Sequence, residues 1–336
     1  MNSKRLHQLL ECFPLKKVLV MGDFFLDQYL MLDRDISEIS VETNLESYQV
    51  RTIRNSPGAA GTVTNNLRAL DVNVTALGAI GDDGRGYDLK KELRRRNVDI
   101  SNLIESDLIM TPTYTKPMMS GKKEPMHELE RMDIKNRSHM PAEIEKKIIS
   151  HMKKAFPESD GMIIVDQVQE KNCGVMTDAV IDALAELALQ YPEKPILVDS
   201  RLHTADFRNI ILKCNESEAL QASGKKTLEE AAAALFEKNP RGAFISLGEK
   251  GMFVCEKGKG QHVPGIHVDG PIDIVGAGDS AASGIISTLC SGGTFAEAGE
   301  IGNLIASITI RQIGTTGTAK RSEVEAVNAE QLNKII

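Results

Sequence analysis

Short apolar runs alternate with amphipathic stretches along most of this chain, and this alternation restricts the possible folds more than any other feature. The apolar runs predict strands at 18–21, 74–80, 161–166, 196–199, 210–212, 243–247 and 252–255. The amphipathic stretches predict helices at 60–70, 86–96, 143–154, 175–189, 228–237, 277–291 and 295–312. Strands that alternate with helices form a mostly parallel sheet with helices on both faces. We therefore expect a single α/β domain over residues 1–336, and 336 residues are enough for one.

Two segments depart from the alternation. Residues 33–54 are polar with interleaved β-branched residues, and residues 109–119 also have a strand pattern, whereas residues 120–140 predict a polar connection. The first segment is too polar for the core and too long for a simple loop. We therefore expect both segments to form a small lid of strands on the main domain. No helix would cover the apolar face of this lid, so we also expect a homodimer in which the lids of two copies pair.

A glycine-rich turn before the helix predicted at 277–291 is the strongest candidate for chemistry. It reads Asp273-Ile-Val-Gly-Ala-Gly-Asp279 and is followed by small and apolar residues. Such a turn leaves free backbone N–H groups at the positive end of the helix dipole, which is a ready anion site. A carboxylate would repel a bound phosphate, so Asp279 needs another role. It either takes a proton from a hydroxyl that attacks a phosphoryl group or caps the helix.

Other polar residues follow predicted strands at the edge where parallel sheets bind ligands. They are Gly22-Asp23, Asp166, Asp199 and Asn215. Polar residues are common at strand ends, so these positions do not by themselves identify a site. Asn215 is followed three residues later by Glu218, which is the spacing of a capping box at the start of a helix.

The composition argues against several classes of partner. A net charge of −7 gives no basic footprint for nucleic acid or for an acidic membrane. The chain has no Trp and only 4% aromatic residues, which weakens any case for stacking on bases. It has no run of 18 apolar residues, so no membrane span is expected. Five dispersed cysteines without a C-x-x-C pair indicate reduced thiols in a cytoplasmic protein.

Several separate motifs, taken together and in order, resemble one enzyme family. They are Gly22-Asp23 with Asp27, Pro57-Gly-Ala-Ala-Gly61, Leu77-Gly-Ala-Ile-Gly-Asp-Asp-Gly84 and the turn Asp273–Asp279. With them the chain resembles the ribokinase-like (PfkB) family of carbohydrate kinases, from about residue 16 to about residue 320. Residues 112–116 (PTYTK) and 131–133 (RMD) are similar to its heptose 7-phosphate kinase branch. The resemblance implies a ribokinase-like three-layer α/β sandwich with a small β lid, ATP as phosphoryl donor, and Mg²⁺.

For the acceptor, the resemblance implies that Asp27 binds sugar hydroxyls, since a carboxylate accepts several hydrogen bonds. Gly58, Ala59 and Thr62 correspond to the family's Gly-Gly segment and to the substrate-binding Asn that follows it. Ala59 stands in place of the second Gly and Thr62 in place of the Asn, so these two departures bear on which sugar is bound.

A second acceptor candidate lies in the predicted connection at 120–140. Arg131 either binds a sugar phosphate bidentately or forms a surface salt bridge, and Asp133 is its neighbour in the same motif.

For the nucleotide, the resemblance implies that Asn215 and Glu218 act near Mg²⁺ and the triphosphate, usually through water. Magnesium needs only a few hard oxygen ligands from the protein. By the same likeness the nucleotide would also meet Gly248, Gly251, Asn303 and the segment 314–317. Many members of the family need K⁺ near the anion site, where Val275 here replaces the usual Thr, and this leaves the K⁺ requirement open.

The expected reaction is ATP-dependent phosphorylation of a hydroxyl on a sugar or sugar phosphate. Asp279 would take the hydroxyl proton, while backbone N–H groups stabilise the developing charge. These groups belong to Gly276, Ala277, Gly278 and Asp279. The chain ends after the kinase-like part, and we expect no fused nucleotidyltransferase.

Two alternatives stay open. One is a nucleoside kinase of the same fold, with Phe24, Phe25 and Tyr114 around the base. The other is a nonenzymatic sugar-binding protein on the kinase scaffold, which the departures at Ala59, Thr62 and Val275 would favour.

Overall fold

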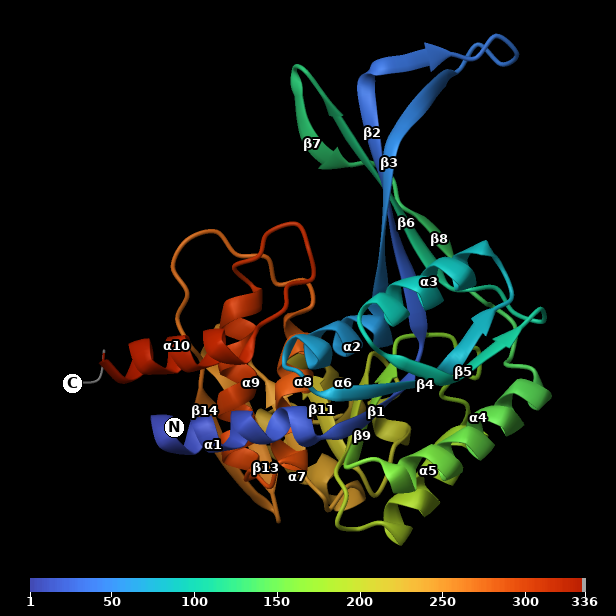
Figure 1. The fold of residues 1–336 in the computed structure, drawn as a ribbon. Coiled ribbons are helices and arrows are strands. Elements are labelled where there is room, and N and C mark those ends of the chain that lie inside the picture. The colour runs from blue at the N-terminus through green and yellow to red at the C-terminus, as the bar shows by residue number, and fades with distance from the viewer. Residues whose placement is uncertain (334–336) are drawn as a thin grey trace.

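A computed structural model describes residues 1–333 as an α/β body with a lid of strands standing away from it (Figure 1). The strands are β1 (Lys17–Gly22), β2 (Phe24–Ile39), β3 (Glu46–Ala59), β4 (Asn73–Gly81), β5 (Asp99–Ser106), β6 (Thr113–Gly121), β7 (Glu124–Glu128), β8 (Met132–Ile134), β9 (Gly161–Asp166), β10 (Ile196–Ser200), β11 (Ile211–Asn215), β12 (Ala243–Ser246), β13 (Gly251–Glu256) and β14 (Lys259–Pro264). The helices are α1 (Ser3–Cys12), α2 (Ala60–Ala69), α3 (Gly84–Arg95), α4 (Ala142–Ala155), α5 (Asp178–Gln190), α6 (Glu216–Ser223), α7 (Leu228–Lys238), α8 (Ala277–Cys290), α9 (Phe295–Thr309) and α10 (Arg321–Asn333).

The main sheet has nine strands in the order β14-β13-β12-β11-β10-β9-β1-β4-β5. Strands β12 to β5 in this order are parallel, and β13 and β14 add an antiparallel edge. In β1, Val18 and Val20 belong to the core on one face, and Leu19 and Met21 belong to the core on the other. Both faces are therefore buried, as the apolar run predicted.

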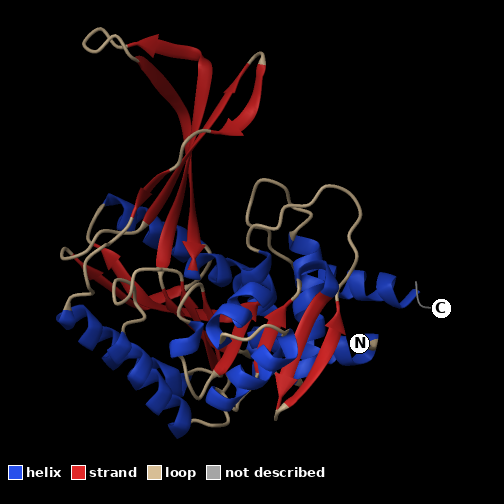
Figure 2. Ribbon diagram, turned by 180° about the vertical axis from the view of Figure 1, so that it is seen from behind, coloured by secondary structure: helices blue, strands red, loops and turns tan. Residues whose placement is uncertain are grey.

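Helices cover both faces of this sheet, so the body has three layers (Figure 2). One core contains residues of α1, α2, α3, α8, α9 and α10, and the other contains residues of α4, α5, α6 and α7. The predicted α/β class and the mostly parallel sheet are confirmed. The two terminal helices α1 and α10 also pack together.

The lid is a second sheet with the order β3-β2-β6-β7, and β8 pairs with β6. Its strands extend beyond the segments predicted at 33–54 and 109–119, because the hairpin of β2 and β3 runs from Phe24 to Ala59 and β6 from Thr113 to Gly121. The start of β2 and the end of β3 are buried in the body. In the sequence, the apolar residues of these parts could not be told apart from those of the core. The prediction of a polar connection at 120–140 was wrong in part, since it contains β7 and β8. These strands are short and exposed, and they carry no apolar pattern.

Candidate active site

The predicted glycine turn begins α8 and leaves backbone N–H groups unpaired. Gly276 is the N-cap and has φ +81°, a left-handed conformation that glycine adopts without strain. The N–H groups of Gly278 and Asp279 have no hydrogen-bond partner among residues 1–333, so they can bind an anion. The N–H of Ala277, also expected to bind the anion, instead donates to the carbonyl of Ile274 at 3.1 Å.

Asp279 lies in the first turn of this helix, but its side chain makes no capping hydrogen bond. Burial raises the pKa of Asp279 to about 7, and the charge of the nearby Asp199 acts in the same direction. Lys213 and Arg201 oppose the rise. A carboxylate whose pKa lies near the working pH is suited to accept a proton from an attacking hydroxyl.

Lys213 is a functional candidate that the sequence reasoning missed. It lies in β11 with 4% of its surface exposed, and its Nζ is 2.5 Å from Oδ2 of Asp199. A Cβ atom on Gly278 would be 3.2 Å from this Nζ, so the ammonium group lies against the first turn of α8. Burial lowers the pKa of Lys213, but Asp199, Asp279 and Glu218 together raise it above the ordinary value, so the group stays charged.

A sequence signal for Lys213 was present. A lone lysine in the apolar run Ile211-Leu212-Lys213-Cys214 is unusual, because a buried lysine requires a partner. It also precedes Asn215 by two residues, which is the spacing for the same face of a strand.

Asn215 and Glu218 form the capping box that their spacing predicted. Oδ1 of Asn215 accepts the N–H of Glu218 at 2.9 Å, and Oε2 of Glu218 accepts the N–H of Asn215 at 2.8 Å. Burial raises the pKa of the half-buried Glu218. The capping box fixes both side chains at the carboxyl end of β11, where the charges of Asp199 and Lys213 act on Glu218.

A cleft of about 390 Å³ begins at this edge. It brings together Asn215, Gly248, Gly251, Asn303, Ala277 and Gly278, all of which were candidates from the sequence. Most of the remaining lining is apolar, including isoleucines 266, 272, 274 and 310. The amide nitrogen of Asn303 donates to the carbonyls of Val263 and Pro264, which leaves its oxygen available as an acceptor. An apolar cleft with a few polar groups fits a planar base.

The acceptor candidates Asp27 and Gly58 lie in contact. A Cβ atom on Gly58 would be 2.9 Å from Cγ of Asp27, so only glycine leaves room for this carboxylate. Asp27 is buried, and its Oδ1 is 3.5 Å from Nζ of Lys116 in the lid strand β6. Burial raises the pKa of Asp27, although Lys116 opposes the rise. The charge of Asp27 also raises the pKa of Asp279. The carboxylate at the base of the lid therefore acts electrostatically on the turn that begins α8.

The two departures from the family pattern lie at the start of α2. Ala59 has φ +51° and ψ −114°, a conformation that favours glycine and costs roughly 1–3 kcal/mol for another residue. Ala59 therefore has a backbone conformation that suits the glycine usual in the family at this position. Thr62 is buried in the first turn of the helix, with 3% of its surface exposed.

Arg131 and Asp133 pair with each other. Nε of Arg131 donates to Oδ1 of Asp133 at 2.7 Å, and Nη2 donates to Oδ2 at 3.0 Å. The guanidinium also lies 4.2 Å from the ring centre of Tyr114, which in turn packs on Phe25. Phe24 and Phe25 are fully buried, so neither is available to stack on a base.

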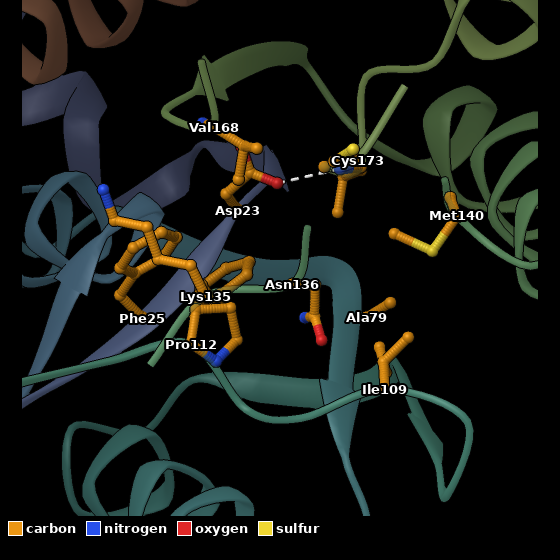
Figure 3. A pocket seen from close by; sticks show the side chains of 13 residues that line it. Asp23, Phe25, Ala79, Ile109, Pro112, Lys135, Asn136, Met140, Val168 and Cys173 are labelled. Atoms are coloured by element: carbon orange, nitrogen blue, oxygen red, sulfur yellow. Dashed lines mark hydrogen bonds between the residues drawn. The ribbon is translucent and has the colours of Figure 1, made fainter. Parts of the chain in front are cut away.

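The strand-end carboxylates Asp23 and Asp166 hold neighbouring loops. Asp23 accepts backbone N–H groups of residues 167, 168 and 175, and burial together with Asp166 raises its pKa. Figure 3 shows the small cavity beside Asp23, whose volume of about 20 Å³ is enough for roughly one water molecule. Asp166 accepts from Oγ of Ser200 at 2.6 Å and is 2.9 Å from Nδ1 of His203.

The segment 314–317, expected to border the nucleotide, is not among the residues that line the apolar cleft. The N–H of Gly314 donates to Oδ2 of Asp273, which ties this segment to the glycine turn. Thr315 and Thr316 line a separate polar hollow, and Thr316 lies against Gly276. The segment therefore packs beside the glycine turn.

Several known proteins are similar to this chain in sequence. A profile of the pfkB family of carbohydrate kinases matches residues 16–321. The bifunctional protein HldE of Trichlorobacter lovleyi is 27% identical over 98% of this chain, and that of Caulobacter vibrioides is 24% identical over 98%. These alignments cover 66% and 70% of the two relatives, so the chain spans about two thirds of their length.

Solved structures share the fold. A ribokinase of Arabidopsis thaliana in complex with ribose and ATP superposes with a TM-score of 0.65 at 16% identity, covering 93% of this chain and 98% of that one. A nucleoside kinase of Burkholderia thailandensis in complex with inosine gives 0.62 at 16% identity, covering 94% and 99%. A carbohydrate kinase of Agrobacterium tumefaciens gives 0.66 at 19% identity, covering 93% and 96%.

Proposed function

The chain belongs to the pfkB family of carbohydrate kinases, which are ATP-dependent phosphotransferases, and on that premise we propose that it phosphorylates a hydroxyl of a sugar phosphate. The observation that carries this proposal is the position of Asp279. It directly follows Ala277 and Gly278, which line the apolar cleft, and the charge of the buried acceptor candidate Asp27 raises the pKa of its carboxyl group. In a kinase the proton acceptor has to stand between donor and acceptor.

In the proposed reaction the acceptor hydroxyl attacks the γ-phosphorus, the bond to the β,γ-bridging oxygen breaks, and ADP leaves. Asp279 takes the hydroxyl proton as the new P–O bond forms. The unpaired N–H groups of Gly278 and Asp279 and the ammonium group of Lys213 stabilise the negative charge on the transferred group. Asp27 accepts hydrogen bonds from other hydroxyls and orients the acceptor.

The charges around Asp27 favour an acidic acceptor. Lys116 and Arg131 both act on this carboxylate, and Lys135 lies 5.9 Å from the ring centre of Tyr114. Each of these cations already lies near Asp27 or Asp133, but all three have further N–H donors, which a sugar phosphate would use more fully than a neutral nucleoside. The burial of Phe24 and Phe25 also removes the aromatic pocket that a nucleoside kinase would need.

Magnesium would supply charge neutralisation of the phosphates when bound. Asn215 and Glu218 would hold it, directly or through water, because their capping box fixes an amide and a carboxylate beside Lys213 and the α8 turn. This small set fits Mg²⁺, which keeps several waters and takes few protein ligands. A K⁺ requirement stays an open part of the proposal, because Val275 replaces the Thr that is usual in the family near the anion site.

We further propose that the protein is a homodimer formed through the lid. Apolar side chains are exposed along β2, β3 and the loop between them, and Val41 keeps 95% of its surface exposed. Ile39, Leu45 and Ile53 are exposed as well. A lid that stands away from the body with such a surface is suited to pair with a second copy.

A cytoplasmic location is proposed from the thiols. All five cysteines are unpaired, as expected in a reducing compartment. Among residues 1–333, no helix has the length and apolar character to cross a bilayer.

A substrate panel tests the proposed function. The protein is incubated with MgATP and pairs of sugars and their phosphates, with nucleosides as a third group, and ADP release is followed. We expect turnover with at least one sugar phosphate and a much lower kcat/KM for the matching neutral sugar. Preferential turnover of a nucleoside would contradict the proposal, and turnover of no compound by a protein that binds ATP would favour a nonenzymatic role.

A further inference from the structure

A polar hollow separate from the apolar cleft lies beside the glycine turn, since its lining residue Thr316 contacts Gly276. It has a volume of about 440 Å³ and lies between α2, the end of α3 and the segment at 315–318. Its lining includes Ser56, Asn65, Arg68, Arg96, Thr315 and Thr316. The two guanidinium groups are accompanied by hydroxyls and amides, and none of the lining residues is acidic. This combination suits a phosphorylated polyol better than a cation or an apolar ligand.

The two arginines keep free donors. Nε and Nη1 of Arg68 donate to the carbonyls of Arg96 and Val72, at 3.0 and 2.6 Å, and Arg68 makes no ion pair within residues 1–333. Arg96 donates from Nη1 to Glu92, which leaves its Nε and Nη2 unused. The bonds to carbonyls fix the positions of the guanidinium groups without neutralising that of Arg68. A fixed guanidinium with free N–H groups is suited to bind phosphate oxygens.

Asn65 supplies an independent observation. Its Nδ2 donates to the carbonyl of Pro57, but its buried Oδ1 has no hydrogen-bond partner in the described part of the chain. An unpaired buried acceptor is unfavourable, by roughly 1–3 kcal/mol. Asn65 also lines the hollow, and the hydroxyls of Ser56 and Thr315 provide hydrogen-bond partners there for a bound polyol.

The hollow adjoins the candidate active site at two points. Thr316 lies against Gly276, since a Cβ there would be 3.3 Å from Cβ of Thr316. Ser56 pairs directly with Asp27 in the antiparallel register of β2 and β3. A ligand in the hollow would therefore touch residues that neighbour both the anion turn and the acceptor carboxylate.

We propose that this hollow is a binding site for the phosphate group of a phosphorylated polyol, held by Arg68 and Arg96. The phosphate belongs either to the acceptor itself or to a separate metabolite that acts on the kinase through Thr316. Both sources present the same chemistry to the two arginines. The site does not depend on the proposed function, because its evidence lies outside the nucleotide cleft.

Calorimetry with a matched pair of variants tests the site. The protein is first saturated with Mg²⁺ and a nonhydrolysable ATP analogue, so that the α8 turn is occupied. It is then titrated with inorganic phosphate and with glycerol 3-phosphate. Arg96→Gln and Arg95→Gln each remove one positive charge and one ion pair to Glu92, but only Arg96 lines the hollow. Thermal unfolding of both variants checks that they are folded.

We expect one site per chain, retained in Arg95→Gln and weakened roughly tenfold or more in Arg96→Gln, as for the loss of a charged hydrogen bond. Absence of binding at about 10 mM ligand, or equal affinities in the two variants, would overturn the proposal. Adding the acceptor found in the substrate panel then identifies the source. Displacement of phosphate by the phosphorylated acceptor, but not by its neutral counterpart, assigns the site to the acceptor. Simultaneous binding assigns it to a separate metabolite. If the panel yields no acceptor, the proposed function fails while the phosphate titration still decides this site.

Discussion

The ammonium group of Lys213 lies against Gly278, because its Nζ is 3.2 Å from the position that a Cβ atom would take there. This contact adds a fixed positive charge to the N-terminus of α8, whose own dipole already favours an anion. The charge is held there by Asp199 on the neighbouring strand. Transfer of a phosphoryl group depends mainly on such fixed electrostatics.

Lys213→Gln is therefore expected to lower kcat by roughly 10²–10³, the range for loss of one donor to a developing charge. Steady-state kinetics with the best acceptor measures this effect. Lys238→Gln is the matched control, since Lys238 is exposed at the end of α7. Because the substitution leaves Asp199 unpaired, circular dichroism has to show that the variant is folded. An unchanged kcat in a folded variant would remove Lys213 from the transfer site.

Asp279→Asn is expected to lower kcat by roughly 10²–10⁴ while nucleotide binding is retained, because only the proton acceptor is lost. The variant should also be more stable than the wild type at pH 8. The raised pKa of Asp279 means that its contribution to stability is present at low pH and is lost as the pH rises through about 7. Thermal unfolding at pH 5 and pH 8 should show a stability gain that grows with pH. Wild-type turnover by this variant would reduce Asp279 to a structural residue.

The pH dependence of kcat/KM reports the same carboxylate. Since burial raises the pKa of Asp279 to about 7, the group is protonated in the free enzyme below that pH and cannot accept the hydroxyl proton. We expect kcat/KM to fall on the acid side of about 7 in the wild type. Lys213 lowers the pKa of Asp279, so the acid limb should move to higher pH in Lys213→Gln. An acid limb at the same pH in both proteins would show that another group titrates.

Ala59→Gly is expected to stabilise the protein by roughly 1 kcal/mol, because φ of +51° costs more for alanine than for glycine. Glycine also makes the unfolded chain more flexible, which reduces the gain. Urea unfolding measures the difference, and Ala69→Gly, at the end of α2, is a control that should destabilise. A destabilised Ala59→Gly variant would mean that the alanine methyl group contributes packing that outweighs the strain.

Charged substitutions test whether the lid forms the dimer interface. Aspartate at Ile39, Val41 and Val50, all exposed, should convert a wild-type dimer to a monomer, since like charges would meet across the interface. Light scattering gives the mass of both proteins. Aspartate at Leu15 and Leu189, which are exposed on the body, provides a control that should stay dimeric. A monomeric wild type, or a dimeric lid variant, would exclude this interface.

The sequence by itself predicted the fold class and most of the candidate site. Buried strands and amphipathic helices carry periodic apolar patterns, and the turn from Asp273 to Asp279 has a local structure that glycine and helix start signals determine. The capping box of Asn215 and Glu218 was predictable for the same reason, because both its partners lie within one turn. In each case the deciding interactions connect residues that are close in sequence.

Only the tertiary structure decided which residues from distant parts of the chain contact these elements. Lys213 contacts Gly278 although the two lie 65 positions apart in the sequence. Asp27 and Lys116 lie close together on two neighbouring strands of the lid. The strands β7 and β8 and the full length of the β2–β3 hairpin depend on pairing in the lid rather than on any apolar period. Likewise Thr316 lies beside Gly276, and Asp273 accepts the N–H of Gly314. Contacts between distant segments leave no periodic signal, since they depend on how the whole sheet and its loops assemble.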